Sequence, residues 1–292
     1  MKYHLSQGDN NMFISPMMLY NAKNNQPFDS KNHIAELKLD GLRCILSHMD
    51  KLYVYTRHND LITHKFPELL RCPVPEGTIL DGELVVLDDQ GKPDFEAMSA
   101  RFLSRKNKKP VVFCAFDILR YKGIDVTGLS LLKRKELLNQ AFKENENYKK
   151  VEMFEGNAIE YYEQVRGRGL EGIIIKSKKE NSIYEINKRS IRWQKVINWT
   201  YADVYISGYR KNNFALLVSI DAADGSKFPV GIVESGVSPI HQKVIESVQK
   251  RLVFKEDKNF AYMEPRIMAR VKTRSWTLSG RLRSPEFMEF VI

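Results

Sequence analysis

The 292-residue sequence has few of the residues that build disulfide frameworks, zinc sites and membrane spans. Its three cysteines, Cys44, Cys72 and Cys114, are an odd number without the short spacing of a zinc knuckle or a disulfide-rich domain. Six histidines are scattered along the chain and do not predict a zinc site either. No run reaches the ~18 apolar residues that a membrane span needs, and the first residues are polar. We therefore expect a cytoplasmic protein without membrane attachment.

The composition is that of a folded protein with an excess of positive charge. Hydrophobic residues make up 43% of the chain and charged residues 28%, as in globular proteins, and the length allows two domains with separate cores. The 46 Lys and Arg residues against 36 Asp and Glu give a formal charge of +10. That excess favours a polyanionic partner such as nucleic acid, with an ordinary basic protein as the alternative.

The first two thirds of the chain carry strand patterns and two helical patterns. Up to about Asn32 the sequence predicts only a short lead-in. Apolar, β-branched and aromatic runs separated by turn residues then predict strands, mainly of an antiparallel sheet, over 34–39, 44–48, 52–55, 79–87, 111–119 and 173–176. Apolar residues at helical spacing predict helices over 131–142 and 158–165.

After Trp199 the pattern changes to alternating segments with one helix among them. Strands are expected over 202–209, 215–221, 230–234 and 267–272, and a helix over 240–252. Several strands with one inserted helix predict a small barrel of the OB kind. The fold class expected is α+β, with two domains at 1–199 and 200–292.

The segment Lys38-Leu39-Asp40-Gly41-Leu42-Arg43 ends a predicted strand and enters a tight turn. By itself it is compatible with an Asp-Gly hairpin flanked by solvated charges. A lysine at such a place can also be a nucleophile if its amine is activated, since a free lysine with a pKa of ~10.4 is rarely neutral at pH 7. A second cation about 5 Å away lowers a lysine pKa by roughly two units, and an arginine or a metal ion could provide that cation.

This segment resembles the adenylation motif of the covalent nucleotidyltransferases, and further matches follow in the order of that family. They are Thr56-Arg57-His58-Asn59, Leu80-Asp81-Gly82-Glu83-Leu84, Phe116-Asp117-Ile118-Leu119, Glu171-Gly172-Ile173-Ile174-Ile175-Lys176, Arg192-Trp193-Gln194-Lys195-Val196-Ile197 and Gly280-Arg281-Leu282-Arg283-Ser284-Pro285-Glu286-Phe287. Three departures stand out. Asn59 or Asp60 occupies a usual glycine position, and Trp193 replaces the first lysine of the family's K-x-K element. The last element continues with Glu286 and Glu289, where family members often have more basic residues. The set as a whole is similar to ATP-dependent DNA ligases.

The resemblance implies a role for each matched residue. Lys38 is the nucleophile that forms lysyl-AMP, Asp40 and Arg43 are its catalytic partners, and Glu171 with Asp40 holds the metal. The implied nucleotide and substrate contacts are Glu36 at the adenine amino group, Phe116 stacked on adenine, Glu83 at the ribose, Arg43 and Lys176 near the AMP phosphate, Lys195 at the α-phosphate, Arg57 at the 5′-phosphate of the nick and Arg283 at the β- and γ-phosphates. Without the motif order, Phe116 is more often a core aromatic than a ligand contact, and Glu83 and Glu171 are ordinary solvated carboxylates.

The same resemblance implies a fold, a reaction and partners. The fold is an adenylation domain of antiparallel sheets with flanking helices, followed by an OB-type barrel. The cofactors are ATP and Mg²⁺ or Mn²⁺, the substrate is nicked double-stranded DNA, and the protein acts as a monomer in replication or repair. The basic residues at 105–109 and at Arg266, Arg270, Lys272 and Arg274 are either contacts to the DNA backbone or a solvated surface.

Three alternatives remain open at this point. An mRNA-capping guanylyltransferase shares the K-x-D-G motif, but Glu171 stands where aspartate is expected, and 282–285 differs from the R-x-D-K ending of capping enzymes. An RNA ligase more often has K-x-x-G without the aspartate. A non-catalytic nucleic-acid-binding protein could keep the fold, although intact Lys38, Glu83 and Glu171 oppose it.

Overall fold

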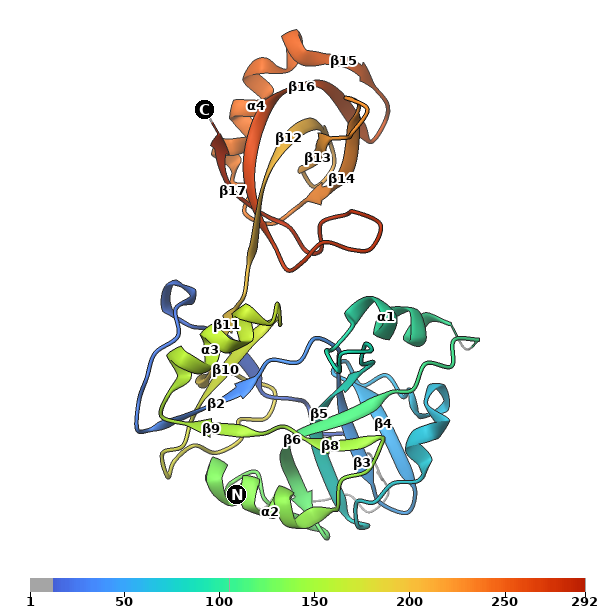
Figure 1. Ribbon diagram of the computed structural model, residues 1–292, viewed down its shortest axis with the longest axis vertical. Coiled ribbons are helices and arrows are strands. Elements are labelled where there is room, and N and C mark those ends of the chain that lie inside the picture. Colours follow the sequence, from blue (N-terminus) through green and yellow to red (C-terminus); the bar gives the residue numbers. More distant parts are fainter. Residues whose placement is uncertain (1–12, 105, 292) are drawn as a thin grey trace, which may run out of the picture. The chain divides into compact units, whose positions relative to one another are not determined.

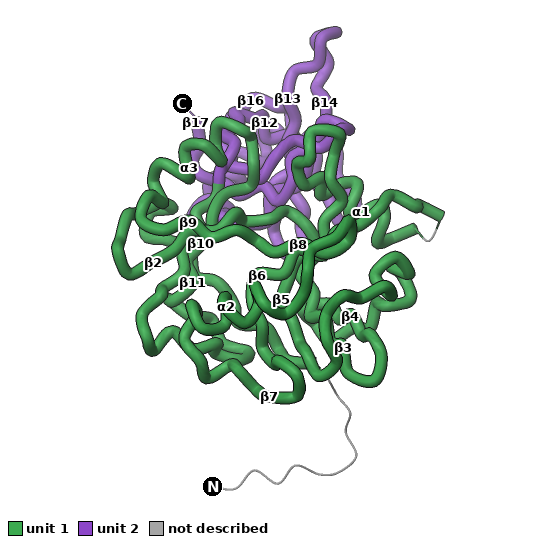
Figure 2. The backbone as a smooth tube through the Cα atoms, turned by 60° about the horizontal axis from the view of Figure 1, so that its bottom comes forward, with its two compact units in different colours: residues 1–197 green, residues 198–292 purple. Residues whose placement is uncertain are grey.

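The computed structural model describes residues 13–104 and 106–291. The chain divides into two compact units, the first ending at Ile197 and the second spanning Asn198–Ile292 (Figure 2). Part of the expected lead-in, residues 1–12, and Arg105 of the expected basic loop lie outside the described residues.

Unit 1 contains two antiparallel-rich sheets. Sheet A has the strand order β1-β11-β10-β2-β9, with β1 (Met18–Asn21), β2 (His33–Leu37), β9 (Met153–Glu155), β10 (Gly172–Ser177) and β11 (Arg189–Ile197). Sheet B has the order β4-β3-β5-β6-β7 with β8 beside β6, and comprises β3 (Leu42–His48), β4 (Leu52–Thr56), β5 (Thr78–Val85), β6 (Val112–Tyr121), β7 (Ile124–Asp125) and β8 (Tyr148–Lys150). Strands β3 to β8 are continuous in sequence, whereas sheet A takes strands from both sides of them.

Three α-helices of unit 1 flank these sheets (Figure 1). Helix α1 (Phe95–Leu103) begins at Asp94, whose side chain accepts a hydrogen bond from the Ala97 amide. Helix α2 (Leu131–Ala141) packs on β6 of sheet B, and α3 (Ala158–Gly167) packs on β10 of sheet A. The 3₁₀ turns are η1 (Lys23–Asn25), η2 (Thr63–Lys65) and η3 (Pro67–Leu70).

Side-chain alternation gives sheet A one face of packing residues and one of functional residues. Ala35, Ile173 and Ile175 belong to the core that also includes Tyr162 and Val165 of α3. The opposite face, which we call the cleft face, carries Ile34, Glu36, Ile174, Lys176, Trp193 and Lys195, because β10 pairs Ile174 with Glu36 and Lys195, and Lys176 with Ile34 and Trp193. Residues of sheet B contact the cleft face: Phe116, Ile45 and Ile79 share a buried core with Trp193.

Unit 2 is a curved antiparallel sheet around a core of its own. The strand order is β14-β13-β12-β16-β15, with β17 on β16, and the strands are β12 (Thr200–Arg210), β13 (Ala215–Asp221), β14 (Lys227–Val233), β15 (Val253–Glu256), β16 (Phe260–Thr273) and β17 (Glu286–Val291). Helix α4 (Pro239–Leu252) begins with a capping box in which Ser238 and His241 exchange hydrogen bonds.

Each expected strand and helix is present, with shifted ends and several additions. The strand expected over 34–39 ends at Leu37, and the expected lead-in contains β1. The sequence patterns did not reveal α1, β7, β8, β9, β11, β15 or β17. Among the described residues no helix is long and apolar enough to cross a membrane.

Candidate active site

Lys38 lies immediately after β2, held by its backbone and by its side chain. Its amide donates to the Gly172 carbonyl at 2.9 Å, and its Nζ donates to Glu171 Oε2 at 2.7 Å. The Lys38 side chain is 18% exposed and that of Glu171 7%. Both line a hollow of 230 Å³ with Asp40 and with residues 37, 88, 92, 93, 169 and 170. The structure therefore brings together the predicted nucleophile and both predicted metal ligands.

Two motif glycines allow the backbones around Lys38 to approach closely. A Cβ on Gly41 would lie 2.2 Å from the Leu84 carbonyl oxygen, and one on Gly172 would lie 2.1 Å from that of Val196. Gly172 also has a φ of +143°, which side-chain-bearing residues rarely adopt. The glycines in K-x-D-G and E-G thus set how β5 and β11 pack beside the loops that carry Lys38 and Glu171.

Arg43 is fixed by a bidentate pair with Asp81. The guanidinium donates from Nε at 3.1 Å and from Nη2 at 2.7 Å to the two carboxylate oxygens, and the Tyr184 hydroxyl donates to the same carboxylate at 2.6 Å. Although burial opposes it, the pair with Asp81 raises the pKa of Arg43. The pair with Asp81 therefore keeps Arg43 positively charged and fixes its orientation in the cleft. The guanidinium lies 5.4 Å from the centre of the Phe116 ring.

Glu83 lies opposite Arg43 in the β3–β5 register. Burial raises its pKa to about 8, against the opposing influence of Lys38 and Arg43. At pH 7 its carboxyl group is therefore mostly protonated and can donate as well as accept a hydrogen bond. A hydroxyl-bearing group such as ribose matches that capacity.

Glu36 is a buried carboxylate between two lysines. It is 1% exposed; its Oε2 lies 2.6 Å from Lys176 Nζ and its Oε1 lies 2.5 Å from Lys135 Nζ. The Lys176 ammonium is also 4.0 Å from the centre of the Trp193 ring and 4.8 Å from that of Phe116. Glu36 Oε1 and Lys176 Nζ have ion-pair contacts but no hydrogen bond of good geometry with any described residue. Buried polar atoms in this condition mark a place where a ligand can bond.

The other predicted residues are spread over several environments. Phe116 is 8% exposed and meets Trp193 edge to face at 6.0 Å. Lys195 is on the cleft face of sheet A. Arg57 is exposed and donates to His58 Nε2, whereas Arg283 belongs to unit 2. The structure places the Lys176 ammonium at Glu36, while Lys38 bonds Glu171, so the predicted role of Lys176 at the AMP phosphate stays a prediction.

The sequence motifs did not identify three polar residues, Arg134, Lys135 and Tyr184, that bond the buried carboxylates of the cleft. Arg134 of α2 forms a fully buried bidentate pair with Asp117, with Nε–Oδ1 and Nη2–Oδ2 distances of 2.7 and 2.9 Å. Tyr184 and Lys135 are further members, through Asp81 and Glu36 respectively. A signal for the α2 residues exists: positions 131, 134, 135 and 138 repeat at the spacing of a core-facing helix stripe, yet 134 and 135 are cations.

Comparison with known proteins identifies the family. The family model described as ATP dependent DNA ligase domain matches residues 16–196. The chain is 40% identical to the SPbeta prophage-derived DNA ligase-like protein LigB of Bacillus subtilis over 94% of this chain and 98% of that protein. It is 29% identical to the Bacillus subtilis bifunctional non-homologous end joining protein LigD, of which it spans 46%.

Solved structures agree with this result. A mycobacterial DNA ligase D complexed with ATP and MES is 25% identical, with a TM-score of 0.58 and 95% of both chains covered. A Lig E DNA ligase has the same fold, with a TM-score of 0.65 at 20% identity, covering 96% of this chain and 100% of that one. The predicted adenylation domain followed by an OB fold is thereby confirmed. The chain belongs to the ATP-dependent DNA ligase family.

Proposed function

We propose that this DNA ligase seals nicks in duplex DNA through AMP carried covalently on Lys38 Nζ. The observation that carries the proposal is the contact of Lys38 Nζ with Glu171 in a hollow that Asp40 also lines. The buried Glu36 and Lys176 and the ring of Phe116 provide a base site in the same cleft. The formal charge of +10 supports a polyanionic substrate.

The first transfer requires Lys38 to leave its partner. While its Nζ is an ammonium paired with Glu171, it has no lone pair with which to attack a phosphorus atom. After it loses a proton, Nζ attacks the α-phosphorus of ATP; the N–P bond forms and the bond to the pyrophosphate oxygen breaks. The AMP then passes to the 5′-phosphate of the nick, and the adjacent 3′-hydroxyl displaces it as the phosphodiester bond forms. Lys38 is regenerated with each cycle.

The donors present fit a magnesium or manganese ion. Such a hard ion accepts one or two carboxylates and completes its shell with water and substrate phosphates. The hollow is lined by the carboxylates of Asp40, Asp88 and Glu171, of which Glu171 and Asp40 are the predicted ligands. The ion would offset charge on the reacting phosphate. Glu171, once it serves as a ligand, no longer holds the Lys38 ammonium, so release of the nucleophile and binding of the metal would be coupled.

The base site favours adenine on chemical grounds. The Glu36 carboxylate, held by Lys176, can accept a hydrogen bond from the adenine amino group. Guanine presents an oxygen acceptor at that position. An unmatched buried polar group costs about 1–3 kcal/mol, so roughly ten- to a hundredfold preference for ATP follows. Glu83 would bond the ribose, and Arg57 the 5′-phosphate of the nick.

The test is covalent labelling of the full chain with radiolabelled ATP, GTP and NAD in parallel, followed by nicked DNA or nicked RNA. We expect label mainly from ATP, roughly ten- to a hundredfold more than from GTP, transfer to nicked DNA, and no label on Lys38→Ala. Lys92→Ala is the matched control, because Lys92 lines the same hollow, and it should retain the label. Equal labelling by GTP and ATP would support a capping enzyme instead, and label on Lys38→Ala would place the nucleophile elsewhere.

A further inference from the structure

We infer that Lys135, which lies outside every motif of the family, is a positioning residue that holds Glu36 for base recognition and so determines the preference for ATP. The inference rests on the proposed function, in which Glu36 accepts a hydrogen bond from the nucleobase. Helix α2 packs on sheet B, so the inference gives this helix a part in the nucleotide specificity of a site on sheet A.

The placement of Lys135 is unusual for a lysine. Positions 131, 134, 135, 138 and 141 are the buried face of α2, and the Lys135 side chain is only 5% exposed. A buried ammonium requires a partner that compensates for its lost hydration. Its carboxylate partner is Glu36 at 2.5 Å, and its other contact is the Val151 carbonyl at 3.4 Å. Lys135 therefore points into the cleft rather than towards solvent.

Two different elements hold the two oxygens of Glu36. Lys176 comes from β10, the strand paired with the β2 strand that carries Glu36. Lys135 comes from α2 and contacts the other oxygen. With one contact on each side the carboxylate group cannot rotate freely, and each oxygen keeps a further lone pair for a donor. Without Lys135 only the contact along sheet A would remain, and the carboxylate could turn towards Lys176.

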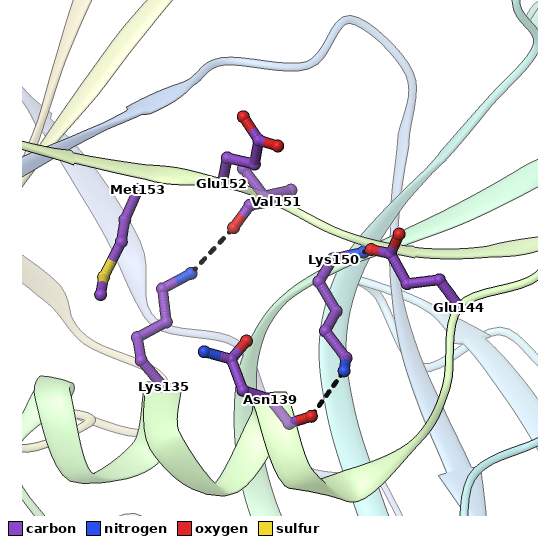
Figure 3. Close-up of a pocket in the computed structure, with 7 residues that line it drawn as sticks. All are labelled: Lys135, Asn139, Glu144, Lys150, Val151, Glu152 and Met153. Atoms are coloured by element: carbon purple, nitrogen blue, oxygen red, sulfur yellow. Dashed lines mark hydrogen bonds between the residues drawn. The ribbon is translucent and has the colours of Figure 1, made fainter.

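A pocket beside Lys135 provides access to it from solvent. The pocket has a volume of 320 Å³ and is lined by Lys135, Asn139, Glu144, Lys150, Val151, Glu152 and Met153. In Figure 3 the Lys135 side chain extends along the pocket towards Val151, while Lys150 reaches to the Asn139 carbonyl. Met153 pairs with Glu36 in the β2–β9 register, so the pocket adjoins the base site. Removal of the Lys135 side chain would join the pocket to the space beside Glu36.

The pocket also offers a matched control. Lys150 donates to the Asn139 and Phe142 carbonyls at the end of α2, at 2.7 and 2.6 Å. Its side chain therefore stabilises α2 and, among the described residues, its hydrogen bonds do not go to Glu36. If Lys135 only anchored α2, its loss would resemble the loss of Lys150. If Lys135 positions Glu36, the two losses will differ in nucleotide preference.

The experiment measures KM and kcat of self-adenylation with ATP and with GTP for the full-length wild type, Lys135→Ala, Lys135→Arg and Lys150→Ala. For Lys135→Ala we expect the KM for ATP to rise and the ATP-to-GTP preference to fall, each about tenfold, with a much smaller change in kcat. Lys135→Arg should recover most of the preference, because it restores a cation. Lys150→Ala should unfold at a lower temperature but keep the wild-type preference.

Chemical rescue gives a second reading of the same variant. Propylammonium replaces the atoms that Lys135→Ala removes, and it can enter through the pocket. It should restore ATP preference in Lys135→Ala several-fold, whereas equal concentrations of tetramethylammonium or sodium chloride should not. A wild-type preference in Lys135→Ala, or equal restoration by all three salts, would overturn the inference. Failure of the wild type to label with ATP would instead contradict the proposed function itself.

Discussion

The carboxyl group of Glu83 links a single residue of the cleft to the stability of the whole chain. Its pKa is about 8 in the folded protein, mainly because of burial, against an ordinary value of 4.5. The folded state therefore binds the proton more tightly than the unfolded state does. This group contributes stability that is fully present below pH 4.5 and is lost as the pH rises through 8.

We predict that Glu83→Gln removes this pH dependence. The wild type should lose several degrees of melting temperature relative to Glu83→Gln between pH 5 and pH 8.5, since a difference of about 1 kcal/mol shifts Tm by roughly 2–4 °C in a protein of this size class. Thermal denaturation at a series of pH values measures the difference. Glu146→Gln, at an exposed position, is the control and should run parallel to the wild type. Parallel curves for Glu83→Gln as well would refute the assignment.

At the scale of an element, α2 depends on a charge that is fully removed from solvent. Arg134 and Asp117 are both 0% exposed and form a bidentate pair. Arg134 also donates to the Leu129 and Ser182 carbonyls, so it ties α2 to β6 and to the loop before β11. Although burial opposes the change, Arg134 lowers the pKa of Asp117.

We predict that Arg134→Met destabilises the protein by about 3–5 kcal/mol, because it leaves Asp117 as an uncompensated buried charge. Urea unfolding at pH 7 measures the change. Arg166→Met removes a surface pair with Glu163, whose side chains are 60% and 49% exposed, and should change stability by at most about 0.5 kcal/mol. Similar effects of the two substitutions would show that the buried Arg134–Asp117 pair contributes no more to stability than a surface pair.

The elements that the sequence predicted are those whose pattern is local. β6 is a long apolar run, and α3 has apolar residues at helical spacing. β11 escaped detection because its alternation is inverted, with Ser190 buried and Ile191 69% exposed. β1 is only four residues long and pairs with β11 at positions about 170 residues away. Such a strand is set by its partner, which no local pattern reveals.

The same distinction applies to the site. Lys38, Glu83, Phe116 and Glu171 lie within short motifs and were named from the sequence alone. Lys135 lies in a helix between motifs, and only packing of α2 on sheet B brings it to Glu36. A lysine in a helix ordinarily faces solvent, so the residue type alone predicts that Lys135 lies on the exposed face of α2. The contact depends on tertiary structure, and the sequence shows it only as a polar residue at an apolar position.

At the scale of the whole molecule, the predicted site residues are divided between two units with separate cores. Lys38 belongs to unit 1, and Arg283, predicted at the β- and γ-phosphates, belongs to unit 2. If Arg283 orients the pyrophosphate leaving group, it matters only in the first transfer.

Two of the basic residues predicted at the DNA backbone, both in β16, form ion pairs within unit 2: Arg270 bonds Asp203, and Lys272 pairs with Glu286.

We predict that Arg283→Ala strongly depresses self-adenylation while joining of pre-adenylated nicked DNA stays near the wild-type rate. The two half-reactions are measured separately, with labelled ATP and with a pre-adenylated substrate. Arg281→Ala, at an exposed position in the same loop, serves as the control for a general loss of positive charge. An Arg283→Ala enzyme that adenylates normally but fails at joining would reverse the assignment.

Along the sequence, all strands of sheet B lie between β2 and β9 of sheet A, and this order has a consequence for biosynthesis. All strands of sheet B have left the ribosome once Lys150 has emerged, and they can pair with one another. Sheet A still lacks β9, β10 and β11 at that moment, and Lys38 must wait for Glu171, which is 133 residues further along. A nascent chain therefore holds Lys38, the proposed nucleophile, long before it holds Glu171 and Lys176. Under the proposed function, nucleotide capture would begin only when unit 1 has been synthesised in full, so that an incomplete chain would not carry AMP.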